Sequence, residues 1–240
     1  LRVEGRTVTL FPPERLPPFS LRVPGDLSSA AFLILAGALV PDSEVVVEDV
    51  GLNPTRTGLL DVLRAMGAEL TVTCQETAGP EPVGTVTVRG SCLKGTEVAG
   101  DLVVRMIDEF PVLAVAATQA RGRTVVRDAG ELRVKETDRI ATLVSELRRL
   151  GAKIEPLPDG FVVEGPCSLR GGTVDSHGDH RLAMALAVAG LVAQEPVAVE
   201  GAEHIEDSFP GFAECLKEIG ASDVEWFHRA GRADRMADSS

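Results

Sequence analysis

The sequence predicts an α/β fold in which parallel apolar helices lie inside a barrel-like domain and sheets lie outside them. A run that is apolar on every face, as suits a buried helix, recurs three times. The runs open at Asp26, Asp108 and Asp179. Amphipathic runs follow them and end each time in a leucine, three residues and a Gly-Ala pair, at Gly67, Gly151 and Gly220. Three copies of roughly 70 to 80 residues indicate an internally repeated α/β unit of inside-out design.

The first copy follows short strand patterns at Val3, 7–10 and 21–23, which surround a proline-rich loop at 12–18. Ser28 is the expected cap of an apolar helix that runs to Val40. A β-branched strand at 44–50 and an amphipathic helix at 59–66 come next, and strand character resumes at 69–73 and 84–88.

The second and third copies repeat this order. Asp108 opens an apolar helix, and a strand at 123–127, a helix at 137–150 and strands through 161–163 follow it. Asp179 opens the third apolar helix, followed by a strand at 197–199 and a helix at 211–219. We expect residues 223–240 to be a disordered tail, because the repeat pattern decays there.

Composition narrows the class of protein. A chain of 240 residues that is 44% hydrophobic can bury a substantial core. A net charge of −12 argues against nucleic acid or an anionic membrane surface as a partner. The four cysteines lack CxxC spacing, so we expect reduced, mostly buried thiols in a cytoplasmic protein. The longest apolar runs are too short to span a bilayer.

The stretch 132–139, LRVKETDR, carries the densest charge, where a loop enters a helix. Lys135 and Arg139 are a helical turn apart with Glu136 between them, so they could point the same way. If the apolar helices are parallel, their N-termini gather six ionisable residues at one end. These are Asp108, Lys135, Glu136, Arg139, His180 and Arg181.

Such a set suits a ligand with phosphate and carboxylate groups, because arginine grips either with two hydrogen bonds. Two carboxylates among the cations suit proton transfer, one accepting and the other donating a proton. His180 is either a donor to a phosphate or a structural contact at the helix start. The alternative for the whole cluster is a solvated helix start with a local ion pair.

Other site classes lack their motifs. The HGDH stretch at 177–180 does not have the i, i+4 spacing of a helical metal site, so we expect no metal. The sequence has no phosphate-binding GxxxxGK[ST], no GxGxxG after a strand and no GxSxG. We therefore expect no nucleotide cofactor and no covalent catalysis.

Five motifs taken in order resemble 5-enolpyruvylshikimate-3-phosphate synthase. They are GDLSSAA at 25–31, NPTRTG at 53–58, RVKETDR at 133–139, GDHRLAMA at 178–185 and SFPGF at 208–212. The resemblance covers only the C-terminal half of that enzyme. It implies a fold of three βαβαββ units per domain, with residues 1–20 ending the N-terminal domain or crossover and 21–222 forming the C-terminal domain.

The implied reaction transfers the enolpyruvyl group of phosphoenolpyruvate to the 5-hydroxyl of shikimate 3-phosphate, in the shikimate pathway of aromatic amino-acid biosynthesis. On this resemblance Asp108 accepts a proton and touches shikimate phosphate, and Glu136 is the partner carboxylate. Lys135 lies near the 5-hydroxyl. Arg139 and Arg181 hold phosphoenolpyruvate, and His180 supports the pocket. The implied partner is the N-terminal half of the same enzyme, without which we expect no activity.

One departure and two alternatives accompany this interpretation. Some family members place a lysine before the hydroxyl-Phe-Pro motif, where this chain has Asp207. That carboxylate either lowers the positive potential beside the phosphoenolpyruvate site or is a cap or solvated loop residue. The alternative functions are a UDP-N-acetylglucosamine enolpyruvyl transferase, which lacks the KETDR signature, and a folding or binding half-domain without activity.

Overall fold

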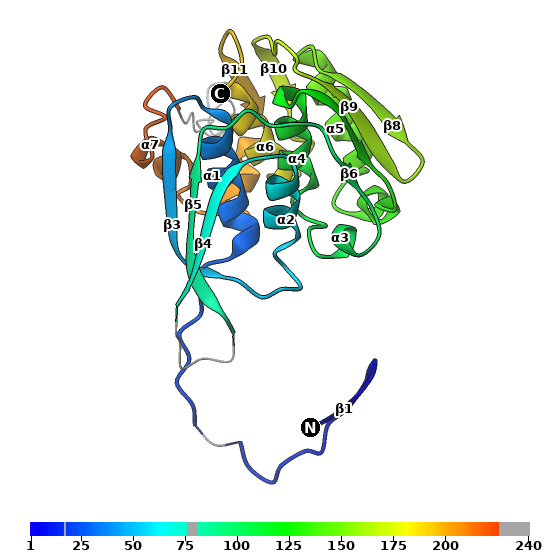
Figure 1. The fold of residues 1–240 in the computed structure, drawn as a ribbon, viewed down its shortest axis with the longest axis vertical. Helices are drawn as coiled ribbons and strands as arrows, with labels where there is room; N and C mark the ends of the chain where they lie inside the picture. Colours follow the sequence, from blue (N-terminus) through cyan, green and yellow to red (C-terminus); the bar gives the residue numbers. More distant parts are fainter. Residues whose placement is uncertain (17, 76–80, 226–240) are drawn as a thin grey trace, which may run out of the picture.

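The computed structural model describes residues 1–16, 18–75 and 81–225. Three apolar helices lie in the middle of the molecule and contact one another (Figure 1). They are α1 (Leu27–Leu39), α4 (Phe110–Gln119) and α6 (His180–Gly190). Every residue of α1 from 30 to 38 is buried, which agrees with its lack of a polar face. The prediction of buried apolar helices is confirmed.

Sheets flank these helices. One sheet has the order β3-β5-β4, all antiparallel, and packs β3 and β5 against α1. A second has the order β6-β7-β9-β8 and packs β9 against α4, while a parallel pair β10-β11 packs β11 against α6 and β10 against α5. The strands are β3 (Glu44–Gly51), β4 (Glu69–Gln75), β5 (Val83–Arg89), β6 (Glu97–Val98), β7 (Gly122–Val126), β8 (Lys153–Leu157), β9 (Gly160–Gly165), β10 (Gly172–Asp175) and β11 (Val197–Glu200).

The remaining helices bury one face only. They are α2 (Gly58–Ala65), α3 (Asp101–Val104), α5 (Arg139–Arg149) and α7 (Phe212–Glu218), with 3-10 turns η1 (Gly130–Val134) and η2 (Ala202–Asp207). On α5 the apolar face is Ile140, Leu143, Val144 and Leu147, which packs toward β8 and β9. The mixed α/β class is therefore confirmed, and the division into three repeated units stays a prediction.

Close packing between α1 and its sheet depends on Gly37. A Cβ atom added there would lie 2.8 Å from Cβ and Cγ2 of Val45 and 3.0 Å from Cγ1 of Val88. Real Cβ atoms do not approach so closely, so the hydrogen of glycine sets the distance between the helix and the strands. Elsewhere in the core, the aromatic rings of Phe32 and Phe212 pack in an edge-to-face arrangement, with their centroids 6.1 Å apart.

Two predicted helix starts are wrong. Ser28 does not cap α1, because Asp26 accepts the hydrogen bond from Ser29 N at 3.1 Å. Asp108 does not open α4, which begins at Phe110 with Glu109 at the cap position. Pro111 explains the later start, since proline lacks the N–H and fixes the backbone angle that suits the first helical turn.

The N-terminal segment extends away from the helices and sheets (Figure 1). It carries the two-stranded hairpin β1 (Arg2–Glu4) and β2 (Thr7–Thr9), whose residues are exposed on both faces. The predicted strand at 21–23 is wrong: those residues are exposed and are not part of a strand. Gly25 instead forms an isolated β-bridge to Val50. The predicted domain boundaries near residues 20 and 222 stay predictions, and most of the predicted tail, 226–240, lies outside the described residues.

All four cysteines are free, but the prediction that they are mostly buried is wrong, because Cys74 and Cys92 are exposed. Cys74 lies on β4, an edge strand of its sheet, where one side has no neighbouring strand. Among the described residues, no helix has the length and apolar character to cross a membrane. Nor does the described part of the chain group three His, Cys, Asp or Glu side chains where a metal ion could bind.

Candidate active site

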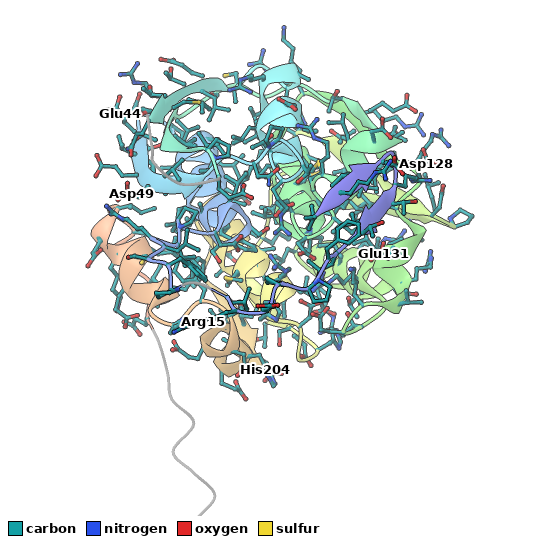
Figure 2. All side chains as sticks on the ribbon, turned by 90° about the horizontal axis from the view of Figure 1, so that it is seen from below. Arg15, Glu44, Asp49, Asp128, Glu131 and His204 are labelled. Carbon is teal, nitrogen blue, oxygen red and sulfur yellow. The ribbon has the colours of Figure 1, made fainter. Side chains whose placement is uncertain are left out.

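The candidate site lies where the four helices α1, α4, α5 and α6 begin. Asp179 caps α6 by accepting from Arg181 N at 2.9 Å and from Leu182 N at 3.2 Å. Asp138 caps α5 by accepting from Ala141 N at 3.0 Å. Figure 2 views the molecule from the end at which these helices begin. Unpaired N–H groups and aligned peptide dipoles make such an end electropositive, which suits an anionic ligand.

Arg139, the first residue of α5, is the centre of the site and is only 2% exposed. Its Nε donates to Oδ2 of Asp179 at 2.6 Å, and its Nη2 donates to Oε2 of Glu136 at 2.6 Å. Its Nη1 reaches Oδ1 of Asp108 at 3.3 Å. One guanidinium thus binds carboxylates from three separate stretches of the chain, so its donors already have protein partners.

Asp108 bridges two arginines. Its Oδ1 accepts from Arg139, and its Oδ2 lies 3.3 Å from Nη2 of Arg181. The side chains of Asp108 and Arg181 are 24% and 16% exposed, so both reach solvent while Arg139 does not. A partly exposed carboxylate fixed between two cations is placed to contact a ligand, and its orientation is set by the protein.

Lys135 does not join this cluster in the structure. Helix α5 begins only at Arg139, so Lys135 precedes it in extended backbone. Its Nζ donates to Oε1 of Glu131 at 2.7 Å, and Glu131 is labelled in Figure 2. The prediction that Lys135 and Arg139 are one helical turn apart is wrong. Asp138 caps α5, so the helix begins at Arg139 and Lys135 lies in the loop before it.

Glu109 adds a buried carboxyl group behind the site. It is 3% exposed, and burial raises its pKa above the ordinary value, opposed by a hydrogen bond with Ser28 and by the charge of Arg181. Within the described residues its Oε1 has no hydrogen-bond partner. The Glu109–Ser28 contact joins the starts of α4 and α1, and Ser28 also accepts from Nη2 of Arg56 at 2.7 Å.

His180 begins α6 beside Arg181. Burial lowers the pKa of His180 below its ordinary value, and the positive charge of Arg181 lowers it further. The neutral imidazole is therefore favoured near neutral pH. A neutral ring offers one donor and one acceptor nitrogen, so it can support a ligand without adding charge.

The structure therefore brings together five of the six predicted residues, counting His180 through its place beside Arg181. Sequence reasoning missed Asp179 as the main partner of Arg139, because the two lie 40 positions apart. It missed Glu131 as the partner of Lys135, although their i, i+4 spacing was a usable signal. It gave no role to Glu109, and the signal there was an acid within an otherwise apolar run.

Asp207 lies at the end of η2 with a side chain 73% exposed, and His204 Nδ1 is 3.4 Å from its Oδ2. The alternative that Asp207 caps the next helix is wrong. The cap position of α7 is held by Gly211, in the left-handed backbone conformation that glycine adopts without strain. Asp207 is a solvated residue with one weak partner.

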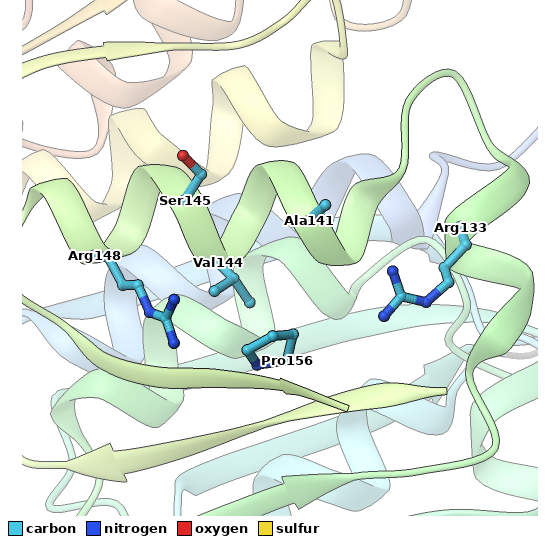
Figure 3. A pocket seen from close by; sticks show the side chains of 6 residues that line it. All are labelled: Arg133, Ala141, Val144, Ser145, Arg148 and Pro156. Atoms are coloured by element: carbon cyan, nitrogen blue, oxygen red, sulfur yellow. The ribbon is translucent and has the colours of Figure 1, made fainter. Parts of the chain in front are cut away.

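A surface pocket of about 450 Å³ lies elsewhere, between α5 and β8 (Figure 3). Arg133 and Arg148 stand at its two ends, and their Nε atoms donate to strand-side carbonyls of Pro158 and Ile154 at 2.7 and 2.8 Å. The other lining residues are Ala141, Val144, Ser145 and Pro156. None of the six predicted site residues lines this pocket.

Comparison with known proteins gives consistent results. The family model described as "EPSP synthase (3-phosphoshikimate 1-carboxyvinyltransferase)" matches residues 2–216. A 3-phosphoshikimate 1-carboxyvinyltransferase of Roseiflexus castenholzii is 55% identical over 222 residues, which are 91% of this chain and 52% of that protein. One of Bacillus thuringiensis is 50% identical over 216 residues, 90% of this chain and 50% of that protein.

A solved structure of EPSP synthase from Acinetobacter baumannii has a TM-score of 0.80 at 43% identity, covering 82% of this chain and 46% of that one. The enolpyruvyl transferase NikO of Streptomyces tendae, 22% identical with a TM-score of 0.61, shares the fold, covering 81% of this chain and 42% of that one. The chain spans about half the length of the curated relatives it matches. These matches confirm the resemblance seen in the motifs: the chain belongs to the EPSP synthase family.

Proposed function

We propose that this chain is the C-terminal part of a 3-phosphoshikimate 1-carboxyvinyltransferase and that it works together with an N-terminal part. The reaction is transfer of the enolpyruvyl group from phosphoenolpyruvate to the 5-hydroxyl of shikimate 3-phosphate, with release of phosphate. Family membership and the half-length match support this proposal. The observation that carries it is the carboxylate of Asp108, fixed between Arg139 and Arg181 at the common start of the helices.

The proposed chemistry is addition followed by elimination. Asp108 takes the proton of the 5-hydroxyl, and the oxygen of that hydroxyl then bonds to the central carbon of phosphoenolpyruvate. Glu136 delivers a proton to the methylene carbon, and its side chain is 46% exposed and so open to a ligand. Loss of a proton from that carbon and of phosphate then restores the double bond. General acid and base assistance of this kind contributes about 10²–10⁴-fold each.

The cations divide the remaining work. Arg181 is partly exposed and is the proposed phosphoenolpyruvate contact. Lys135 lies near the 5-hydroxyl once it leaves Glu131, and neutral His180 supports the pocket. Arg139 reaches phosphoenolpyruvate only if a donor now bound to Asp108 or Glu136 turns to the ligand. Its first effect is to hold those two carboxylates in place.

The proposed architecture follows the family. Residues 21–222 form the C-terminal domain of three βαβαββ units, and residues 1–20 belong to the N-terminal domain or the crossover. Exposed apolar side chains in the N-terminal segment support this assignment, since isolated strands do not expose such residues without a partner. They include Leu1, Val3, Val8, Leu10, Phe11, Leu16 and Phe19.

The test is turnover with and without the N-terminal half. Phosphate release from phosphoenolpyruvate and shikimate 3-phosphate is expected at background for this chain alone. It is expected to appear when the N-terminal half of a related enzyme is added in trans. Turnover by this chain alone would contradict the two-part proposal, and no turnover in any combination would favour the second candidate, a folding or binding half-domain. Replacing shikimate 3-phosphate by UDP-N-acetylglucosamine tests the sister transferase, for which the family match gives no support.

A further inference from the structure

Helix α5 carries an acid on its buried side. Glu146 is 0% exposed, although it stands beside the apolar residues that pack α5 onto the sheet. A buried carboxylate loses its hydration and is tolerated only where hydrogen bonds replace the water. Its presence in the core face of an amphipathic helix therefore calls for partners, and the structure provides them from a distant stretch of chain.

Both carboxylate oxygens of Glu146 hold the loop that leads into α6. Oε2 accepts from the backbone N of Asp175 at 3.0 Å, and Oε1 lies 3.1 Å from Nε2 of His177. The third partner is Arg149 on the same helix, whose Nη1 is 3.3 Å from Oε2. Two of the three contacts thus reach the loop at 175–179.

This loop has an unusual backbone. His177 has φ of 53° and Gly178 has φ of 78°, so two consecutive residues lie in the left-handed region. Histidine is strained there, and local bonds hold the conformation: His177 N donates to Oδ1 of Asp175 at 2.7 Å. The contact to Glu146 fixes the His177 ring from the other side.

The loop is held at both ends by one helix. Arg139 and Glu146 are seven residues apart on α5, which is about two turns, so they lie on the same face. Arg139 binds Asp179 and Glu146 binds Asp175 and His177. The loop therefore runs along α5 toward its start, and it places Arg181 next to Asp108, with His180 at the first position of α6.

We propose that Glu146 is a positioning residue, which fixes the loop 175–179 against α5 and so sets where His180 and Arg181 stand in the site. It does not touch the reacting atoms, because it is buried two turns away from Arg139. Its consequence for catalysis rests on the proposed function, but its effect on the loop is a property of this chain alone.

The first experiment measures amide hydrogen exchange in the full chain. Glu146→Ala is expected to raise exchange about tenfold or more at Asp175, whose N–H loses its carboxylate acceptor. Exchange at His177, Gly178 and Arg181 is expected to rise as well, because the loop is no longer held against α5. Exchange at Val162 and Val163 of β9 is expected to stay unchanged. Glu146→Gln is expected to restore slow exchange, because its amide oxygen accepts from Asp175 N and its NH2 donates to Nε2 of His177 in the tautomer in which that nitrogen is the acceptor.

Arg149→Ala is the matched control, since it removes the charge partner of Glu146 and leaves both bonds to the loop. If Glu146→Ala does not fold, His177→Ala removes one bond from the loop side and is expected to raise exchange at Gly178 and Arg181 only. Unchanged loop exchange in Glu146→Ala and His177→Ala, or a rise spread evenly over α5, β8 and β9, would overturn the proposal.

The second experiment uses the chain reassembled with an N-terminal half. Glu146→Ala is expected to raise the KM for phosphoenolpyruvate about tenfold with a smaller loss of kcat, because Arg181 is displaced, and Glu146→Gln is expected to rescue it. A loss confined to kcat would contradict positioning of Arg181. Absence of turnover in the parent protein would remove the proposed function and leave the exchange result intact, so the two failures are distinguishable.

Discussion

Arg139 and Asp179 lie 40 residues apart and form the most buried ion pair of the site, with Nε 2.6 Å from Oδ2 and side chains 2% and 0% exposed. Asp179 also caps α6, so the same carboxylate ties the starts of α5 and α6 together. Because Asp179 both binds Arg139 and caps α6, this pair connects the KETDR loop to the third apolar helix.

Removing the cation of this pair is expected to destabilise the chain strongly. Arg139→Leu leaves Asp179 buried without its counter-charge, which costs about 3–5 kcal/mol of the free energy of unfolding. Urea denaturation measures this loss. Arg64→Leu is the matched control, because it breaks the half-exposed pair with Asp61 and is expected to cost about 1 kcal/mol or less. Equal losses in the two variants would contradict the central place given to Arg139.

Neutralising Asp108 tests the proposed base. In the reassembled enzyme Asp108→Asn is expected to lower kcat by about 10²–10⁴-fold while the KM of either substrate changes much less. Steady-state phosphate release over a range of both substrates measures it. Asp61→Asn, which alters another Asp–Arg pair away from the site, is expected to keep the parent rate. A parent-like kcat for Asp108→Asn would exclude it as the base.

Glu109 predicts a pH dependence of stability. Burial raises its folded pKa, so the folded state keeps its proton at pH values where the unfolded chain has lost it. The folded state then binds more protons, and stability falls as pH rises from the ordinary glutamate pKa through the raised one. Glu109→Gln removes this loss, so the variant is expected to gain stability over the parent as the pH rises above the ordinary glutamate pKa, until the raised pKa is passed.

Denaturation by urea at several pH values measures this difference. The control is Glu155→Gln, whose side chain is 75% exposed and pairs with Arg148 at the surface. Its difference from the parent is expected to stay constant with pH over the same range. A constant difference for Glu109→Gln as well would mean that the folded protein carries Glu109 ionised.

Asp207 predicts an effect on inhibition by glyphosate, an anionic mimic of phosphoenolpyruvate. In the reassembled enzyme Asp207→Lys is expected to tighten glyphosate by about two- to fivefold at low salt, since an exposed charge acts weakly and is screened. Glu206→Lys makes the same charge change one residue earlier and is the control. Equal inhibition constants for the parent and Asp207→Lys would show that this side chain does not face the ligand.

The sequence predicted the buried helices and most of the ionisable residues that the structure brings together, because both depend on local pattern. A helix that is apolar on every face, such as 30–38, is buried in the core. The charged residues at the starts of such helices come together when the helices pack side by side. The sequence did not predict which charges pair. From the pattern alone, Arg139 could face a ligand, Glu136 or a distant carboxylate such as Asp179, and the packing of α5 against α6 brings Asp179 to it.

Exact helix starts were also beyond the pattern. Both Asp26 and Ser28 are good caps, and only the backbone geometry of the turn decides between them. The sequence predicts that Asp108 opens an apolar helix, yet Pro111 shifts the helix start and frees Asp108 to bind two arginines. Glu146 was hidden for another reason, since its partners at 175 and 177 come from a loop with no regular pattern.

Gly37 reverses a common rule of protein engineering. Replacing glycine by alanine inside a helix usually stabilises a protein by about 0.4–1 kcal/mol, because alanine restricts the unfolded chain. In α1 the added methyl group would meet Val45 at 2.8 Å, so the helix would have to move away from β3 and β5. Gly37→Ala should therefore lower the thermal midpoint of unfolding. Adding Val45→Ala to that variant should recover part of the loss, because the smaller side chain leaves room for the new methyl group. Thermostability programmes that replace every helical glycine would weaken this protein at the contact that sets the distance between its first helix and its sheet.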